Sequence, residues 1–127
     1  MQENEISRRI VVAAVEVHRT LGGPGLLESV YEEALFYELT QIGLQVERQV
    51  NVPIYYKETL LATPLRLDMC VNQCVLIECK SQHPYNSIAE SQLLTYLRLT
   101  AMRLGLVINF GEKYVRDGIH RVVNNLR

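Results

Sequence analysis

Charged side chains interrupt two short apolar segments that run from Leu65 to Lys80. Asp68 lies in the first segment, and Glu78 and Lys80 lie in the second. A charge inside a buried strand is costly unless it is paired or bound to a metal. Two carboxylates can hold a hard divalent cation, and a lysine beside them can act on the water or phosphate that the cation activates. These residue types favour a metal-dependent hydrolytic site, and the alternative is an ion-pair cluster that includes Arg66.

The register of this predicted hairpin decides whether the two acids meet, because side chains alternate between the two faces of a strand. A two-residue loop at Asn72 and Gln73 would mix charged and apolar side chains on one face. A loop that extends to Cys74, or a bulge, places Asp68 opposite Glu78. One face would then be wholly apolar, with Leu67, Met69, Val71, Val75, Ile77 and Cys79. The other face would hold both acids and the lysine, in the set Arg66, Asp68, Cys70, Leu76, Glu78 and Lys80.

Other polar residues could join this site from predicted helices. Glu28 lies in the first turn of a predicted helix, where the helix dipole alone favours an acid, and Glu32 lies one turn further on nearly the same face. Gln92 and Tyr96 are four residues apart, so they share a helix face. Their amide and phenol could hydrogen-bond the lysine or a phosphate oxygen, although Tyr96 also suits a packed core. His83 follows the site lysine closely, and we expect it beside the site.

The elements that position these residues follow from hydrophobic periodicity and turn signals. Valines alternate with other residues from Val46 to Val52, and the following Pro53 places this predicted strand near a sheet edge. Ser87 and Glu90 have the spacing of a capping box at the start of a helix. The predicted helices are 5–20, about 27–41 and 87 to about 103, and the last predicted strand is 105–109. This order predicts a mixed α+β fold around one sheet.

Length and composition bound the class of protein. The 127 residues suffice for one domain with its own core, so we expect a single domain over 1–127. A hydrophobic content of 48% and a charged content of 21% are typical of soluble globular proteins. The net charge of −1 does not itself indicate nucleic-acid binding. Residues 65–127, however, hold 8 Lys/Arg and 5 Asp/Glu, so this half could face phosphates or could be a solvated surface of mixed charge.

Cysteine usage and hydropathy bear on the compartment. Cys70, Cys74 and Cys79 all lie on or beside the predicted hairpin, and an odd number in apolar strands favours reduced, packed thiols. No apolar run approaches the length of a membrane span. The apolar stretch near the N-terminus is interrupted by Glu16 and His18, and no cleavage site of a signal peptide follows. We therefore expect a cytoplasmic protein without a membrane partner.

The spacing of the charged residues resembles a known nuclease signature. Asp68 followed by Glu78-x-Lys80 resembles the PD-(D/E)xK motif, with Leu67 in place of the proline that names the motif. The segment Gly25-Leu-Leu-Glu-Ser-Val-Tyr31 resembles the GxxExxY motif of one small bacterial branch of that superfamily. The first pattern arises often by chance, whereas the second is more specific.

Two later segments extend the resemblance. Gln92-Leu-Leu-Thr-Tyr96 resembles the Q-x-x-x-Y helix that follows the catalytic strands, and Gly105 to Phe110 resembles the next strand. The four blocks occur in family order between about His18 and Val123. The resemblance implies a restriction-endonuclease-like core in the order α-β-β-β-α-β, and metal-dependent hydrolysis of phosphodiester bonds in DNA, or alternatively RNA.

The resemblance also implies a role for each residue of the site. The groups expected to hold Mg²⁺ or Mn²⁺ are Glu28, Asp68, Glu78 and the backbone carbonyl of Cys79. Lys80 would assist the attacking water and Gln92 would support it, while the residues expected close by are Glu32, Arg66, His83 and Tyr96. Two alternatives stay open. The same fold could bind nucleic acid or protein without turnover, and the sheet edge near 46–56, with its tyrosines, could form a homodimer.

Overall fold

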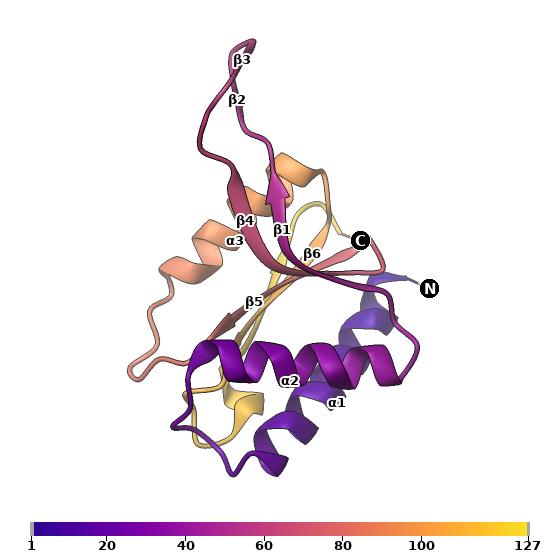
Figure 1. The fold of residues 1–127 in the computed structure, drawn as a ribbon, viewed down its shortest axis with the longest axis vertical. Helices are drawn as coiled ribbons and strands as arrows, with labels where there is room; N and C mark the ends of the chain where they lie inside the picture. Colours follow the sequence, from indigo (N-terminus) through magenta and orange to yellow (C-terminus); the bar gives the residue numbers. More distant parts are fainter. Residues whose placement is uncertain (1, 127) are drawn as a thin grey trace.

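A five-stranded mixed sheet organises the chain, and helices pack against both of its faces (Figure 1). The computed structural model describes residues 2–126. The helices are α1 (Glu3–Thr20), α2 (Glu28–Gln41), α3 (Ile88–Thr100) and the 3-10 helix η1 (Val115–Gly118). The sheet has the order β1-β4-β5-β6-β7, formed by β1 (Val46–Val52), β4 (Leu65–Val71), β5 (Val75–Lys80), β6 (Leu104–Asn109) and β7 (Ile119–Val123). A separate pair consists of β2 (Tyr55–Tyr56) and β3 (Thr59–Leu60).

The predicted α+β class is confirmed, and the three predicted helices are present with slightly different ends. β5 and β6 are parallel and are joined through α3, since a parallel pair needs a long crossover connection. The capping box predicted for α3 does not form. The side chain of Asn86 instead accepts a hydrogen bond from the Ile88 N–H (3.0 Å), and the Glu90 carboxylate binds the Tyr85 hydroxyl (3.1 Å).

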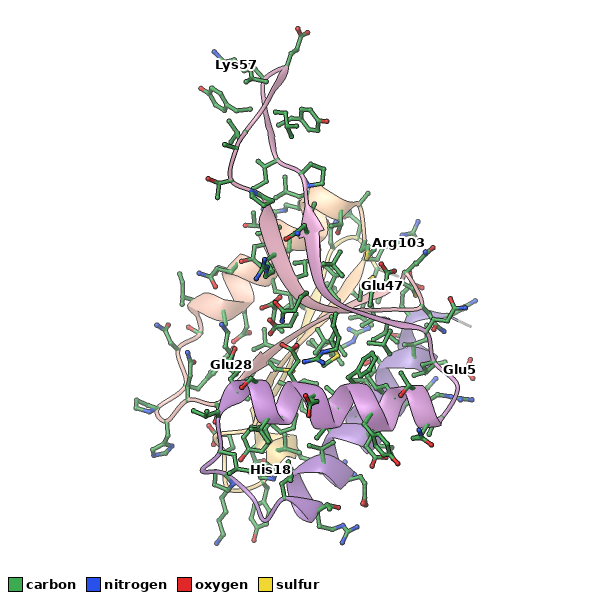
Figure 2. The ribbon with its side chains drawn as sticks, in the orientation of Figure 1. Glu5, His18, Glu28, Glu47, Lys57 and Arg103 are labelled. Carbon is green, nitrogen blue, oxygen red and sulfur yellow. The ribbon has the colours of Figure 1, made fainter. Side chains whose placement is uncertain are left out.

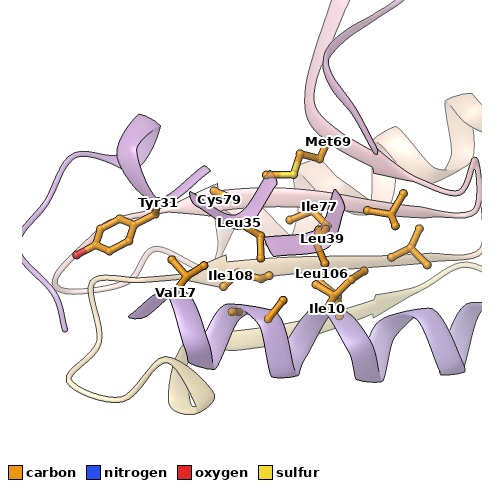
Figure 3. Close-up of a cluster of buried hydrophobic side chains, with 14 of the residues drawn as sticks. Ile10, Val17, Tyr31, Leu35, Leu39, Met69, Ile77, Cys79, Leu106 and Ile108 are labelled. Carbon is orange, nitrogen blue, oxygen red and sulfur yellow. The ribbon is translucent and has the colours of Figure 1, made fainter. Parts of the chain in front are cut away.

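Each face of the sheet is covered by an apolar cluster. α1 and α2 cover one face, where Ile10 and Leu35 pack with Ile77 of β5 (Figure 3). α3 covers the other face, where its leucines pack against Leu76 and Cys70. This second face of the hairpin is therefore apolar at Cys70 and Leu76, which the predicted register places on the same face as the two acids and the lysine. The physical reason is that a strand with helices on both sides is apolar on both sides, so charged residues are confined to the strand ends.

The predicted register of the β4–β5 hairpin is confirmed. Met69 pairs with Ile77, and this register places Asp68 opposite Glu78. The loop has the three predicted residues, 72–74, because Val71 pairs with Val75, and the first two loop residues have positive φ (51° and 53°).

A change of face in β1 and β4 was not predicted. Leu67 packs in the α3 cluster, whereas Met69 packs in the α1–α2 cluster, so the expected single apolar face including Leu67 is wrong. β1 changes face in the same way, since Val50 also packs against the α3 cluster. Gln49, which precedes Val50 on β1, has a φ of 52° and lies opposite Asp68 in the register. A left-handed residue interrupts strand alternation, and Asp68 lies at the point where the alternation breaks.

The described residues also bear on membrane association and on the thiols. Within residues 2–126, no helix is long and apolar enough to cross a membrane. Cys70 and Cys79 are buried, Cys74 is half-buried, and all three are free thiols.

Candidate active site

The candidate site lies where β4 and β5 separate beyond their last ladder pair, Met69 with Ile77. Beyond this pair, side-chain carboxylates accept hydrogen bonds from the backbone N–H groups. The Asp68 N–H donates to Glu78 Oε1 at 3.1 Å, and the Cys79 N–H donates to Asp68 Oδ2 at 2.8 Å. These crossed bonds hold each carboxylate against the opposite strand, so the two acids stay close together.

Both acids of this pair resist ionisation. Burial raises the pKa of Glu78 to about 8, and the negative charge of Asp68 adds to the effect. Burial also raises the pKa of Asp68 to about 6, although the hydrogen bond from the Cys79 N–H opposes that rise. Lys80 is the positive charge that favours ionisation of both acids. Near neutral pH the pair therefore retains a proton and is a suitable place for a further cation.

α2 brings a third acid to the site. Glu28 is the first residue of the helix and lies beside β5 (Figure 2). Burial raises the pKa of Glu28, while Lys80 lowers it. The Glu28 charge in turn contributes to the raised pKa values of Asp68 and Glu78. Three carboxylates from two strands and one helix therefore act on one another around a single lysine.

The turn before α2 is held by the last residue of the GxxExxY segment. The Tyr31 hydroxyl donates to the Gly23 carbonyl (2.7 Å) and accepts from the Leu26 N–H (3.2 Å). The Tyr31 ring stacks on Phe110, with ring centroids 4.6 Å apart. The turn also approaches the segment after β5, where the Ser81 hydroxyl donates to the Leu26 carbonyl (2.9 Å). These contacts fix the start of α2, and so the position of its first acid, against the end of β5.

Glu32 has partners that the sequence analysis did not identify. The residue is 5% exposed, and its carboxylate accepts hydrogen bonds from Arg48 (3.1 and 3.0 Å) and from the Gln49 amide (3.0 Å). The structure thus ties Glu32 to the break in β1, and its charge also raises the pKa of Asp68. The sequence held a usable signal for this contact. A buried acid one turn after Glu28 needs a cation, and the neighbouring strand could supply one.

α3 contributes from the opposite side of the sheet. Tyr96 is half-buried, and its pKa is raised by burial and then by the charges of Glu78 and Asp68. Gln92 lies one turn earlier and is exposed. Arg66 is exposed on β4, two residues before Asp68.

A buried asparagine shapes the segment that follows Lys80. Asn109 is fully buried at the end of β6, and its Oδ1 accepts from the Gln82 N–H (2.9 Å) and the Gly111 N–H (3.1 Å). Its amide donates to the Gln82 carbonyl (3.0 Å). The neighbouring His83 is exposed and lines a shallow hollow with the glycine turn before α2. Asn109 was not among the predicted site residues, although a polar residue that ends an apolar strand is a usable signal.

The donor chemistry of the site fits a hard cation. Among residues 2–126, no group of three or more His, Cys, Asp or Glu side chains is arranged to hold a metal ion. Asp68 and Glu78 nevertheless supply adjacent carboxylate oxygens whose burial and mutual repulsion raise the pKa values of both. A divalent cation with oxygen ligands would relieve that repulsion.

Comparison with known proteins identifies the family. A family model for the PD-(D/E)XK nuclease superfamily matches residues 4–122, so the chain belongs to this superfamily. The five-stranded mixed sheet with helices on both faces agrees with the restriction-endonuclease-like fold. Comparisons with curated proteins and with solved structures gave no significant match.

Proposed function

We propose that this protein is a metal-dependent nuclease that hydrolyses phosphodiester bonds in DNA, with RNA as the alternative substrate. The observation that carries the proposal is the crossed hydrogen bonding of Asp68 and Glu78 beside Lys80, in a chain of the PD-(D/E)XK nuclease superfamily. Superfamily membership alone does not establish activity, because sites change on a retained fold. We further propose a single nuclease-like domain over 1–127, of the GxxExxY branch.

Each residue of the site has a proposed role. Asp68 and Glu78 hold Mg²⁺ or Mn²⁺, together with Glu28 and the backbone carbonyl of Cys79. Such a cation, when bound, lowers the pKa of its water and stabilises charge on a phosphoryl oxygen. Lys80 orients the water or balances charge on the phosphate. The charge of this lysine also lowers the pKa values of Glu28, Asp68 and Glu78 and so favours their ionised forms.

The remaining site residues support these groups. Gln92 contacts the phosphate or the lysine through its amide, and Tyr96 does so through its hydroxyl. Glu32 keeps β1 in place through its ion pair with Arg48 (3.0 Å). The exposed positions proposed to lie along the substrate are Arg66 and His83.

The test is cleavage of labelled single- and double-stranded DNA and RNA with Mg²⁺, Mn²⁺ or EDTA. We compare the wild type with Lys80→Ala and Glu78→Gln, and we use Glu33→Gln as a control because Glu33 is an exposed acid of α2. We expect metal-dependent cleavage by the wild type and the control, and a loss of at least about 100-fold in both site variants. Equal cleavage by all four proteins would indicate contamination. Tight binding without cleavage would favour the binding-module alternative.

Two further proposals concern the oligomeric state and the cellular location of the protein. A homodimer through the edge of the sheet is supported by the position of β1 at the end of the strand order, and light scattering on a size-exclusion column tests it. A cytoplasmic location is supported by the three free cysteines.

A further inference from the structure

A two-stranded arm, residues 53–64, projects from one end of the main sheet (Figure 1). Within it, Tyr55 pairs with Leu60 and Tyr56 pairs with Thr59, in a sheet separate from the main one. All residues from 55 to 64 are exposed. A two-stranded ribbon on its own is marginally stable in water, so an arm of this kind gains from a binding partner.

The arm displays large side chains away from the core. Tyr55 and Tyr56 are 62% and 63% exposed, and Leu60 is 57% exposed. Successive residues of a strand point to opposite faces, so each face of the ribbon presents one tyrosine. The Lys57 ammonium lies 5.5 Å from the centroid of the Tyr56 ring. Exposed apolar groups gathered on one projection mark an interaction surface.

The arm is continuous with the strand that carries the candidate site. β4 begins directly after the arm and leads through Arg66 to Asp68. At about 3.3 Å per residue, Leu60 lies at most about 26 Å from Asp68 along the chain. At roughly 3.4 Å for each stacked nucleotide, at most about eight nucleotides span this length. A nucleic acid cut at Asp68 could therefore reach the tyrosines with its flanking bases.

The chemistry of the arm favours unpaired bases as its ligand. Of the side chains that read base edges in a duplex groove, residues 54–61 (Ile-Tyr-Tyr-Lys-Glu-Thr-Leu-Leu) contain Lys57, Glu58 and Thr59 but no Arg, Asn or Gln. Tyrosine rings, by contrast, are stacking platforms for single strands. A second copy of the chain is the less favoured partner, because a stable protein interface uses about 20–30 residues a side and the arm offers far fewer.

We propose that the arm binds the single-stranded flank of the nucleic-acid substrate. Unpaired bases stack on Tyr55 and Tyr56, and Lys57 contacts the phosphate backbone. This inference rests on the proposed nuclease function and extends it, because it assigns a substrate class and a footprint of at most about eight nucleotides on one side of the cut.

The experiment measures binding separately from cleavage. Fluorescence anisotropy in EDTA gives the Kd of a labelled single strand of about 20 nucleotides, a single strand of about 5 nucleotides and a duplex of about 20 base pairs. Tyr55→Ala and Tyr56→Ala are compared with Tyr37→Ala, because Tyr37 is a similarly exposed tyrosine (60%) on α2. We expect each arm variant to raise the Kd of the long single strand at least about tenfold. The arm variants should bind the short strand with the wild-type Kd, and the control variant should bind the long strand with the wild-type Kd.

Three results would overturn the inference. One is an unchanged Kd for the long single strand in both arm variants, and another is an equal loss on the duplex. The third is loss of a dimer in the arm variants while nucleic-acid binding stays the same, which would assign the arm to a second copy. The outcome for the nuclease proposal is separate. Arm-dependent binding by a wild type that never cleaves would leave the arm assignment intact and refute turnover. A wild type that binds no oligonucleotide in EDTA but cleaves with Mg²⁺ would overturn the arm assignment and leave turnover intact.

Discussion

Replacing Glu78 by Gln should stabilise the metal-free protein at alkaline pH. Glu78 is half-buried and its pKa is raised from an ordinary 4.5 to about 8, first by burial and then by Asp68. Between these two values the unfolded chain has released the proton and the folded chain has kept it. The free energy of unfolding therefore falls as the pH rises from about 4.5 to about 8, and it stays low above that range. The glutamine has no proton to lose, and its amide oxygen can still accept from the Asp68 N–H.

The size of the effect follows from the two pKa values. At roughly 1.4 kcal/mol per pKa unit, the rise to about 8 costs the folded wild type about 5 kcal/mol once Glu78 is ionised. That is a large part of the roughly 5–15 kcal/mol by which domains are usually stable. For a chain of this length, 1 kcal/mol changes the Tm by roughly 3–5 °C. We expect the variant to melt about 15–25 °C above the wild type at about pH 9, and to agree with it at about pH 4.

Urea unfolding of both proteins in EDTA across this pH range measures the difference directly. Subtracting the free energy of unfolding of the wild type from that of Glu78→Gln cancels the contribution of groups that titrate equally in both proteins. Glu33→Gln controls for a lost surface charge. Parallel stability curves for wild type and Glu78→Gln would refute the reasoning, since they would mean that Glu78 ionises in the fold as it does in water. Added Mg²⁺ should restore stability to the wild type at alkaline pH, by about 2.7 kcal/mol at 100 times its Kd, and should do so much less in the variant.

Three further substitutions test the contacts around the site. Tyr31→Phe removes both hydroxyl hydrogen bonds to the turn before α2, so we expect a loss of about 1–2 kcal/mol in urea unfolding and slower cleavage, with Tyr37→Phe unchanged. Glu32→Leu leaves the Arg48 guanidinium without its carboxylate, so the free energy of unfolding should fall by about 2–4 kcal/mol. Adding Arg48→Met should recover part of that loss. Gly111→Ala places a Cβ against the backbone after β5, so Tm should fall by several degrees, and an unchanged Tm would contradict the close packing there.

Much of the hairpin could be predicted because its determinants are local. Strand alternation and the turn at 72–74 together require Asp68 to lie opposite Glu78, and the structure has this register. The helices were predictable for the same reason, since their apolar stripes recur every three or four residues. The predictions failed where the position of a side chain depends on residues that are distant in the sequence. The expected single apolar face failed at Leu67, which packs in the α3 cluster because the left-handed Gln49 on the neighbouring strand interrupts the alternation.

By itself, the sequence determined which acids share the end of the hairpin, because alternation and turn chemistry act over a few residues and need no other contact. Only the tertiary structure decided how those acids behave. The raised pKa values of Asp68 and Glu78 come from burial beneath segments distant in the chain. The third acid, Glu28, reaches them because Tyr31 anchors the turn before its helix. Desolvation and charge–charge interaction depend on distances in space, and packing alone sets those distances.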